Sequence, residues 1–369
     1  MNSDGLRIAF FGSSIVSSYW NGACTYYRGI VRALHERGHR VTFYEPDAYE
    51  RQQHRDIEDP PWARVVVYEP TAEAAAQAVA SAAHADVIVK CSGVGVCDRE
   101  LVRAVLDMPG RSLRVWWDVD APATLAALEA GEDAELRDAI PEFDLVLTYG
   151  GGLPVILRYE RLDARRCVPI YNALDPETHH PAEPAPELRC DLSFLGNRMP
   201  DRELRVREFF FGCAERLPQR DFLLGGSGWI AADLPENVRT LGHVETTIHN
   251  VLNSSSLAVL NVSRESMAAN GYSPATRVFE AAGAGACLIT DRWEGIEQFL
   301  EPGSEVLVAR DGAEVAALLD ALEPERAAAI GTAARARVLA EHTYARRALD
   351  VEQVLAEATS PRHSLEGAT

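Results

Sequence analysis

The sequence predicts an α/β protein with two doubly wound parallel sheets, each with helices between its strands. Three observations lead to this prediction. The chain has 369 residues, which exceeds one ordinary hydrophobic core and suits two domains. Short apolar runs that end in glycine or polar residues alternate with helical patterns along the chain. A proline-rich segment, 173–187, separates two stretches that both show this alternation.

The first half opens with an apolar run at 6–11 that ends in Gly12, which is typical of a buried parallel strand followed by a turn. A polar loop leads into a helix at 26–37, with Gly38 at its end. The same pattern predicts further strands at 41–44, 64–68, 87–90, 113–117 and 145–148, and further helices at 71–83, 101–106 and 125–140.

The second half repeats the pattern. The predicted strands are 192–195, 222–224, 238–241, 257–260 and 286–290. The predicted helices are 202–214, one that begins near Arg277, 314–322, 325–341 and 342–357. The last dozen residues, 358–369, are small and polar, and we predict a flexible tail there.

Composition excludes several classes of function. The formal net charge is −19 and no basic run is present, which argues against a nucleic-acid backbone as partner. The seven cysteines show no metal-type spacing, and their odd number without a signal peptide indicates a reducing cytoplasm. No apolar run approaches the roughly 20 residues that span a membrane. The turn after the first strand lacks the GxGxxG fingerprint, which argues against a dinucleotide-dependent dehydrogenase.

The stretch from Gly271 to Asp291 carries the strongest functional signal. Pro274 suits the first turn of a helix, where the backbone amides have no helical partners, and these amides favour a phosphate. Arg277 lies one turn into this helix and Glu280 three residues further, so the two share a face; a mutual ion pair is the alternative use of Arg277. An acid at this depth accepts hydrogen bonds from two sugar hydroxyls. The stretch therefore predicts a bound nucleotide with its ribose at Glu280.

Other strand ends nominate further donor-binding residues, because ligands of doubly wound sheets lie beyond the carboxyl ends of the strands. Arg198 and Arg202 follow a predicted strand, so two guanidinium groups are predicted to clamp a diphosphate there; solvated charges at a helix start are the alternative. His243 either contacts the nucleobase or phosphate or is a plain turn residue. The complete predicted donor set is Gly12, Asn197, Arg198, Arg202, Gly226, His243, Tyr272, Ser273, Thr276, Arg277 and Glu280.

Carboxylates at a strand end in the first half are candidates for acceptor chemistry. Asp118 and Asp120 alternate along the chain and point the same way, so one of them is predicted to act as general base or to orient an acceptor hydroxyl. Capping of the following helix is the alternative. The residues predicted to bind the acceptor, with loop structure as the alternative, are Asn21, Gly22, Tyr26 and Gly150.

The pair His179-His180 has the look of a metal pair, but it lies in the proline-rich segment between the two halves. We therefore predict that the two histidines are ordinary linker residues and that the protein holds no metal and no cofactor.

Several separate motifs together resemble the CgeB-like branch (spore maturation protein type) of GT-B glycosyltransferases, which is related to the retaining family-four enzymes. They span about residues 6 to 356, and the part from Tyr272 to Asp291 is the most specific. The motifs are Asp118-Val-Asp-Ala-Pro, Tyr149-Gly-Gly, Phe194-Leu-Gly-Asn-Arg, Leu241-Gly-His, Tyr272-Ser-Pro-Ala-Thr-Arg-Val-Phe-Glu and Glu341-His-Thr.

The resemblance implies a GT-B fold, with two Rossmann-like domains facing across a cleft and a C-terminal helix that crosses back to the first domain. The acceptor domain would comprise 1–178 with the helix 342–357, and the donor domain 188–341. Glu280 would hold the ribose, and Arg198 with Arg202 the diphosphate. One position departs from the wider family, where two glutamates are spaced by seven residues. This chain has Tyr272 at the earlier position, whose acid normally contacts the donor sugar, so the donor sugar and the retention of configuration stay open.

The sequence thus predicts a bacterial, cytoplasmic, metal-independent glycosyltransferase of the hexosyltransferase class, for which the resemblance implies retention of configuration and Tyr272 leaves it open. The donor would be a UDP-, GDP- or dTDP-sugar, and the acceptor a small molecule, a natural product or a glycan. A second copy of the chain in a homodimer is a further predicted partner. Two alternatives stay open: a nucleotide-sugar epimerase of the same architecture, and a non-catalytic nucleotide-sugar binding protein.

Overall fold

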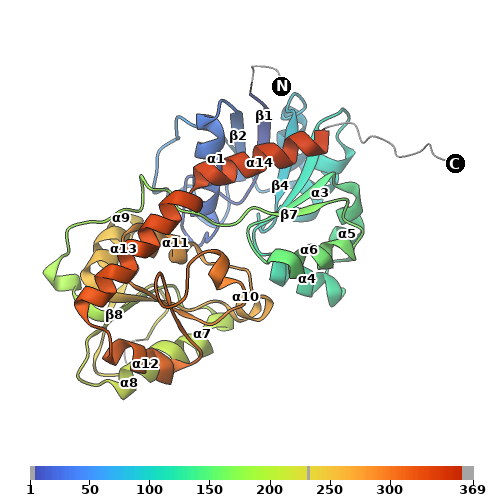
Figure 1. Ribbon diagram of the computed structural model, residues 1–369. Helices are drawn as coiled ribbons and strands as arrows, with labels where there is room; N and C mark the ends of the chain where they lie inside the picture. The colour runs from blue at the N-terminus through green and yellow to red at the C-terminus, as the bar shows by residue number, and fades with distance from the viewer. Residues whose placement is uncertain (1–4, 231–232, 360–369) are drawn as a thin grey trace. The chain divides into compact units, whose positions relative to one another are not determined.

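The computed structural model describes residues 5–230 and 233–359, and Figure 1 shows it as a ribbon. The contacts divide the chain into two compact units. The first unit contains residues 5–149, 153–170 and 345–359, and the second contains 150–152 and 171–344. Most of the predicted tail, from residue 360 on, lies outside the described residues.

The first unit is built on a seven-stranded sheet whose neighbouring strands all pair in parallel. The strand order is β3-β2-β1-β4-β5-β6-β7, so the chain moves outward from β1 in one direction and then returns to its other side at β4. The strands are β1 Arg7–Phe11, β2 Arg40–Pro46, β3 Arg64–Tyr68, β4 Val87–Cys91, β5 Leu113–Asp118, β6 Leu145–Thr148 and β7 Cys167–Pro169.

Both faces of this sheet are buried, as its continuous apolar strands predict. Phe10 and Phe11 are consecutive in β1 and point to opposite faces. Phe11 stacks on Tyr44 with ring centroids 4.5 Å apart, and Phe10 lies 5.6 Å from Trp117. The helices that belong to this unit are α1 Cys24–Glu36, α2 Ala72–Ser81, α3 Asp98–Asp107, α4 Ala121–Glu129, α5 Ala134–Ala139, α6 Gly152–Glu160 and α14 Tyr344–Thr359.

The C-terminal helix α14 belongs to the first unit, as predicted, and lies beside α1 (Figure 1). The carboxylate of Glu352 fixes it there by pairing with the guanidinium of Arg37 at 2.6 Å and the imidazole of His39 at 2.9 Å. Arg37 and His39 flank the glycine that ends α1, so one side chain of α14 contacts both sides of that turn.

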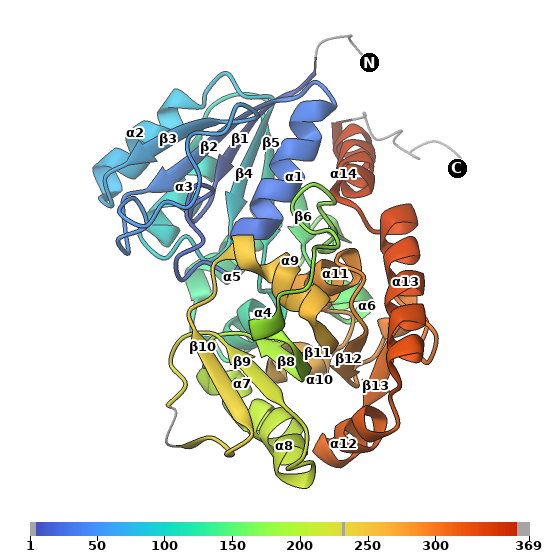
Figure 2. The same ribbon diagram turned by 90° about the vertical axis from the view of Figure 1, so that its left-hand side faces the viewer.

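The second unit is built on a six-stranded parallel sheet of order β10-β9-β8-β11-β12-β13 (Figure 2). Its chain also starts in the middle, at β8, and reverses its direction of travel at β11. A pair of strands at which the order reverses is where doubly wound sheets bind ligands. The strands are β8 Cys190–Leu195, β9 Phe222–Gly225, β10 Val238–Gly242, β11 Ser256–Asn261, β12 Leu288–Asp291 and β13 Leu307–Ala309.

Helices cover this second sheet as well. The predicted helix 202–214 is divided by a π-helical turn at Arg207–Phe211, which places three consecutive phenylalanines in the core. The α-helices of the unit are α7 Pro200–Val206, α8 Gly212–Arg216, α9 Thr246–Ser255, α10 Glu265–Asn270, α11 Thr276–Gly283, α12 Gly312–Asp320 and α13 Pro324–Glu341.

The predicted fold class of two doubly wound parallel sheets is confirmed. The sequence patterns missed β7, β13, α6, α9 and α10. Several of these elements are only three to six residues long, which is too short to show a period. In the described part of the chain, no helix combines the length and the apolar character that a membrane crossing requires.

Gly331 tests the packing of α13 against the turn between α11 and β12. A Cβ atom at this position would lie 2.0 Å from the carbonyl oxygen of Gly285. We expect Gly331→Ala to lower the free energy of unfolding by about 1–3 kcal/mol, because overpacking costs that much. Urea unfolding measures the change. In the same helix, exposed Thr332→Ala is the control and should change stability little. A stabilised Gly331→Ala variant, as helix propensity alone predicts, would contradict the packing described.

Candidate functional site

Two arginine side chains of the second unit share one aromatic ring. The guanidinium of Arg277 lies 5.2 Å from the centre of the Phe194 ring, and that of Arg202 lies 5.5 Å from it. Phe194 belongs to β8, Arg202 to α7 and Arg277 to α11, so three elements bring these groups together. The stacking holds two positive charges side by side on an apolar platform.

The two guanidinium groups lack carboxylate partners. Within residues 5–230 and 233–359, neither Arg202 nor Arg277 makes an ion pair. The Nη2 of Arg202 donates to the backbone oxygen of Asn197 at 2.7 Å, while its Nε is buried without a hydrogen-bond partner. Burial, together with the charge of Arg277, lowers the pKa of Arg202 to about 9. Burial also lowers the pKa of Arg277. An anion between them would relieve both effects.

Glycine leaves the space in front of these charges open. A Cβ atom at Gly196 would lie 2.8 Å from Nη2 of Arg202 and 3.1 Å from Nη2 of Arg277. Gly226, with a φ of +126°, approaches from the neighbouring strand end, and a Cβ atom there would lie 2.2 Å from the backbone oxygen of Gly196. The predicted donor-site residues Asn197 and Gly226 thus follow the ends of the adjacent strands β8 and β9.

The arginine pair lies where the strand order of the second sheet reverses. Phe194 is in β8, and Asn261 ends the adjacent strand β11. The Oδ1 of Asn261 accepts a hydrogen bond from Nη1 of Arg277 at 3.1 Å, and the side chain of Asn261 is fully buried. Sequence reasoning missed Asn261. Its position at the end of an apolar run was the available signal, because such positions face the ligand in doubly wound sheets.

Arg198 differs from Arg202 and Arg277, because the carboxylate of Glu203 already neutralises it. The two bonds, from Nε at 2.7 Å and from Nη2 at 3.0 Å, form a bidentate pair. This pairing raises the pKa of Arg198. Its predicted role at the diphosphate stays a prediction, and the structure offers Arg202 and Arg277 as the charges with fewer partners.

The loop before α11 is held by backbone contacts. Tyr272 has a φ of +49°, and its amide donates to the backbone oxygen of Glu294 at 2.6 Å. Its hydroxyl donates to Oε1 of Glu294 at 3.1 Å, which raises the pKa of Tyr272. The loop also contacts the short segment 150–152, since the amide of Gly151 donates to the backbone oxygen of Tyr272 at 2.6 Å. Gly150 therefore lies beside Ser273 in the second unit.

The first turn of α11 begins at Thr276, and its N-cap residue Ala275 makes no side-chain hydrogen bond. Ser273 is buried, and its hydroxyl donates to the backbone oxygen of Gly271 at 2.9 Å. His243 is exposed in the turn after β10. The predicted ligand contacts of Ser273, Thr276 and His243 stay predictions.

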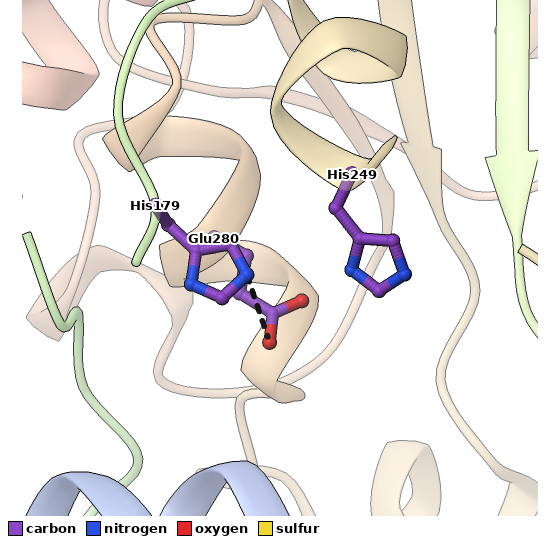
Figure 3. Close-up of side chains that lie close together, drawn as sticks. All are labelled: His179, His249 and Glu280. Atoms are coloured by element: carbon purple, nitrogen blue, oxygen red, sulfur yellow. Dashed lines mark ion pairs between the residues drawn. The ribbon is translucent and has the colours of Figure 1, made fainter. Parts of the chain in front are cut away.

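Glu280 lies one turn further along α11, between two histidines (Figure 3). Its Oε1 is 3.8 Å from Nε2 of His179. His249 in α9 completes the cluster, and sequence reasoning missed it because it is far from Glu280 in the chain. The predicted linker pair His179-His180 is divided: His179 is 2% exposed, whereas His180 is exposed.

In the first unit, Asp118 is fully buried. Its Oδ1 accepts hydrogen bonds from the hydroxyls of Ser92 and Thr124 and from the amide of Asp120, and its Oδ2 accepts one from the hydroxyl of Tyr159. Burial nevertheless raises the pKa of Asp118. These bonds hold the loop after β5 in place, and the predicted catalytic roles of Asp118 and Asp120 stay predictions.

The other predicted residues of the first unit lie in and around the loop after β1. The side chain of Asn21 bonds to Ser13 and to the backbone of the same loop, Gly12 packs against Phe43, and Gly22 is exposed. The Tyr26 hydroxyl donates to the backbone oxygen of Ile170 at 2.7 Å. Their predicted ligand contacts also stay predictions.

A cavity of about 260 Å³ opens beyond the ends of β4 and β5 in the first unit. Trp116 and Leu128 give it apolar walls, and Ser92, Thr124 and Arg99 supply polar groups. Ser92 and Thr124 are the residues whose hydroxyls bond to Asp118, so the cavity lies against that hydrogen-bond network.

Residues 202–353 match a family model described as glycosyl transferase-like. No curated protein matches the chain. Among solved structures, the chain is similar to HepE of Anabaena in complex with UDP and glucose, with 13% identity, 95% of this chain and 100% of that chain covered, and a TM-score of 0.67. The chain is also similar to sucrose-phosphate synthase of Thermosynechococcus elongatus. The identity is 14%, the match covers 95% of this chain and 98% of that chain, and the TM-score is 0.68.

A third similar structure is an α-glucosyltransferase in complex with UDP-glucose and DNA that contains an abasic site, with 10% identity, 96% and 100% coverage and a TM-score of 0.70. At these identities the likeness establishes the fold. The chain has the GT-B fold that its motifs imply.

Arg202 provides a test of the unpaired charges. We expect Arg202→Met to raise the melting temperature of the nucleotide-free protein, because it removes like-charge repulsion and a buried guanidinium with an unbonded Nε. Each kcal/mol gained corresponds to about 2–4 °C for a domain of 150–250 residues. Differential scanning calorimetry measures the shift. Arg198→Met is the matched control and should leave stability unchanged or slightly lower, since it breaks a partly exposed ion pair. If Arg202→Met lowered the melting temperature and Arg198→Met did not, the account would be contradicted, because the charge of Arg202 would then already be compensated in the nucleotide-free protein.

Proposed function

We propose that the protein is a glycosyltransferase that uses a nucleotide diphosphate sugar as donor. The observation that carries the proposal is the pair Arg202 and Arg277, two stacked guanidinium groups at the strand-order reversal of the second sheet that have no ion-pair partner among the described residues. The glycosyl transferase-like match at 202–353 covers both arginines. Similar solved structures hold UDP or UDP-glucose, which makes UDP the first nucleotide to test.

In the proposed complex the diphosphate lies in front of Gly196, where both Nη2 atoms converge. As the bond to the sugar breaks, negative charge develops on the diphosphate, and two preorganised cations stabilise that charge without a metal ion at the phosphates. The amides at the start of α11 and the hydroxyl of Thr276 would add donors on the same side, while Ser273, whose hydroxyl donates to Gly271, holds the loop before them. Glu280, one turn deeper, accepts hydrogen bonds from the ribose.

The acceptor side of the proposal rests on the first unit. The cavity beside Ser92 and Thr124 suits a small, partly apolar acceptor. Asp120, which follows β5, would activate or orient its hydroxyl, while Asp118 holds the loop that carries Asp120. The resemblance favours retention of configuration and a hexosyl group, and the Tyr272–Glu294 pair places an acidic group beside the position where the wider family has glutamate.

A thermal-shift panel of nucleoside diphosphates, without added metal, tests the donor site. A ligand at 100 times its dissociation constant should add about 2.7 kcal/mol to the free energy of unfolding. We expect one nucleoside diphosphate to give this shift. Arg277→Met should weaken its binding by about 10- to 150-fold, since hydrogen bonds to charged groups contribute about 1.5–3 kcal/mol. Arg198→Met is the control and should weaken binding less, because Glu203 already neutralises Arg198.

If no nucleotide raised the melting temperature, the proposal would be overturned. If a nucleotide binds, the release of free nucleoside diphosphate from its sugar conjugate separates the remaining possibilities. A transferase releases nucleotide when an acceptor is present, an epimerase interconverts two conjugates without net release, and a binding protein does neither.

A further inference from the structure

We propose that His179, His249 and Glu280 form a binding site for one divalent transition-metal ion of the zinc class. The inference does not depend on the proposed transferase activity. Its three side chains come from three parts of the second unit: the segment before β8, helix α9 and helix α11. Figure 3 shows the carboxylate of Glu280 between the two imidazole rings.

The geometry brings three possible ligand atoms together. One ring nitrogen from each histidine and one carboxylate oxygen of Glu280 all lie within 4.8 Å of one another. The distance of 3.8 Å from Nε2 of His179 to Oε1 of Glu280 is too long for a hydrogen bond. Ligands of a tetrahedral zinc ion, at about 2.0–2.1 Å from the metal, are about 3.3 Å apart, so binding an ion would draw the three ligand atoms, now within 4.8 Å of one another, closer together.

Both imidazole rings have a buried nitrogen without a partner. Nε2 of His179 and Nδ1 of His249 are buried, and neither has a hydrogen-bond partner within residues 5–230 and 233–359. His179 itself is 2% exposed. A buried polar atom without a partner is costly, which calls for a further group between the rings. A proton can join only two of these three groups, whereas a metal ion can bind all three.

The outer contacts of the rings suit metal ligands. Nδ1 of His179 lies 3.0 Å from the hydroxyl of Thr178, and the backbone of Val244 hydrogen-bonds to the ring of His249. Metal-binding histidines usually use their second nitrogen in this way, which fixes the orientation of the ring.

The donor set selects the metal. Two imidazole nitrogens and one carboxylate oxygen suit Zn²⁺ and its neighbours among the transition metals, whereas Mg²⁺ prefers oxygen ligands. Three protein ligands leave a fourth position open for water. The ion would tie the segment around His179 to α9 and α11. Glu280 has a second carboxylate oxygen, which stays available to a ribose hydroxyl; this last point rests on the proposed function.

The test adds Zn²⁺ alone to the full chain after removal of metals with a chelator. We expect one equivalent to bind in isothermal titration calorimetry and to raise the melting temperature, and chelator should reverse the rise. Co²⁺ in place of Zn²⁺ should give visible absorption bands of nitrogen and oxygen ligation. His179→Ala and His249→Ala should each weaken binding by more than the roughly 10- to 100-fold that loss of an outer contact costs.

His180→Ala is the matched control, because His180 is the next residue, is exposed, and directs Nδ1 at the backbone oxygen of Pro181. It should bind Zn²⁺ like the unaltered chain. If an alanine variant does not unfold cooperatively, His179→Asn and His249→Gln replace it. Lack of zinc binding, or equal zinc binding in both ligand variants and the control, would overturn the inference. Nucleoside diphosphate binding by the metal-free chain is scored separately, so failure of the metal site leaves the donor site untouched.

Discussion

The repulsion between Arg202 and Arg277 is the constraint on which the donor side of this protein depends. Two cations stacked on Phe194, with no ion-pair partner in the part of the chain that the structure describes, are a costly arrangement in a stable fold. Like charges of this kind persist where a ligand supplies the opposite charge. The second sheet, with its buried strands, holds the platform on which the two charges stay together.

The local backbone keeps this arrangement open to a ligand. Gly196 has no side chain in front of the guanidinium groups, and Gly226 fits against its carbonyl at a φ that other residues rarely adopt. Asn261 bonds to Arg277 and aims its guanidinium from the adjacent strand end. The strand order, the two glycines and the asparagine therefore all shape the space in front of the two guanidinium groups.

The fold could be predicted because apolar runs of strand length alternate with helical periods, and this signal is local. Arg202 could be nominated because it follows a strand end, and Arg277 and Glu280 because they share one face of a helix whose first turn favours a phosphate. The partners of these residues could not be predicted. Glu203 lies five residues from Arg198 and neutralises it, a pairing that depends on the turn between them. His249 lies beside Glu280, and Asn261 bonds to Arg277, although both partners are distant in the chain. His179 and His180 are neighbours in the chain, but only the side chain of His179 points toward Glu280.

The most direct measurement compares a nucleoside with its diphosphate by isothermal titration calorimetry on the unaltered protein, without added metal, for each common base. If the two guanidinium groups hold the diphosphate, the diphosphate should bind at least about 100-fold more tightly than the nucleoside, since two bonds to charged groups contribute about 3 kcal/mol or more. The difference should shrink as salt rises. Equal affinity of nucleoside and diphosphate would contradict the account, because the charges would then serve some other purpose.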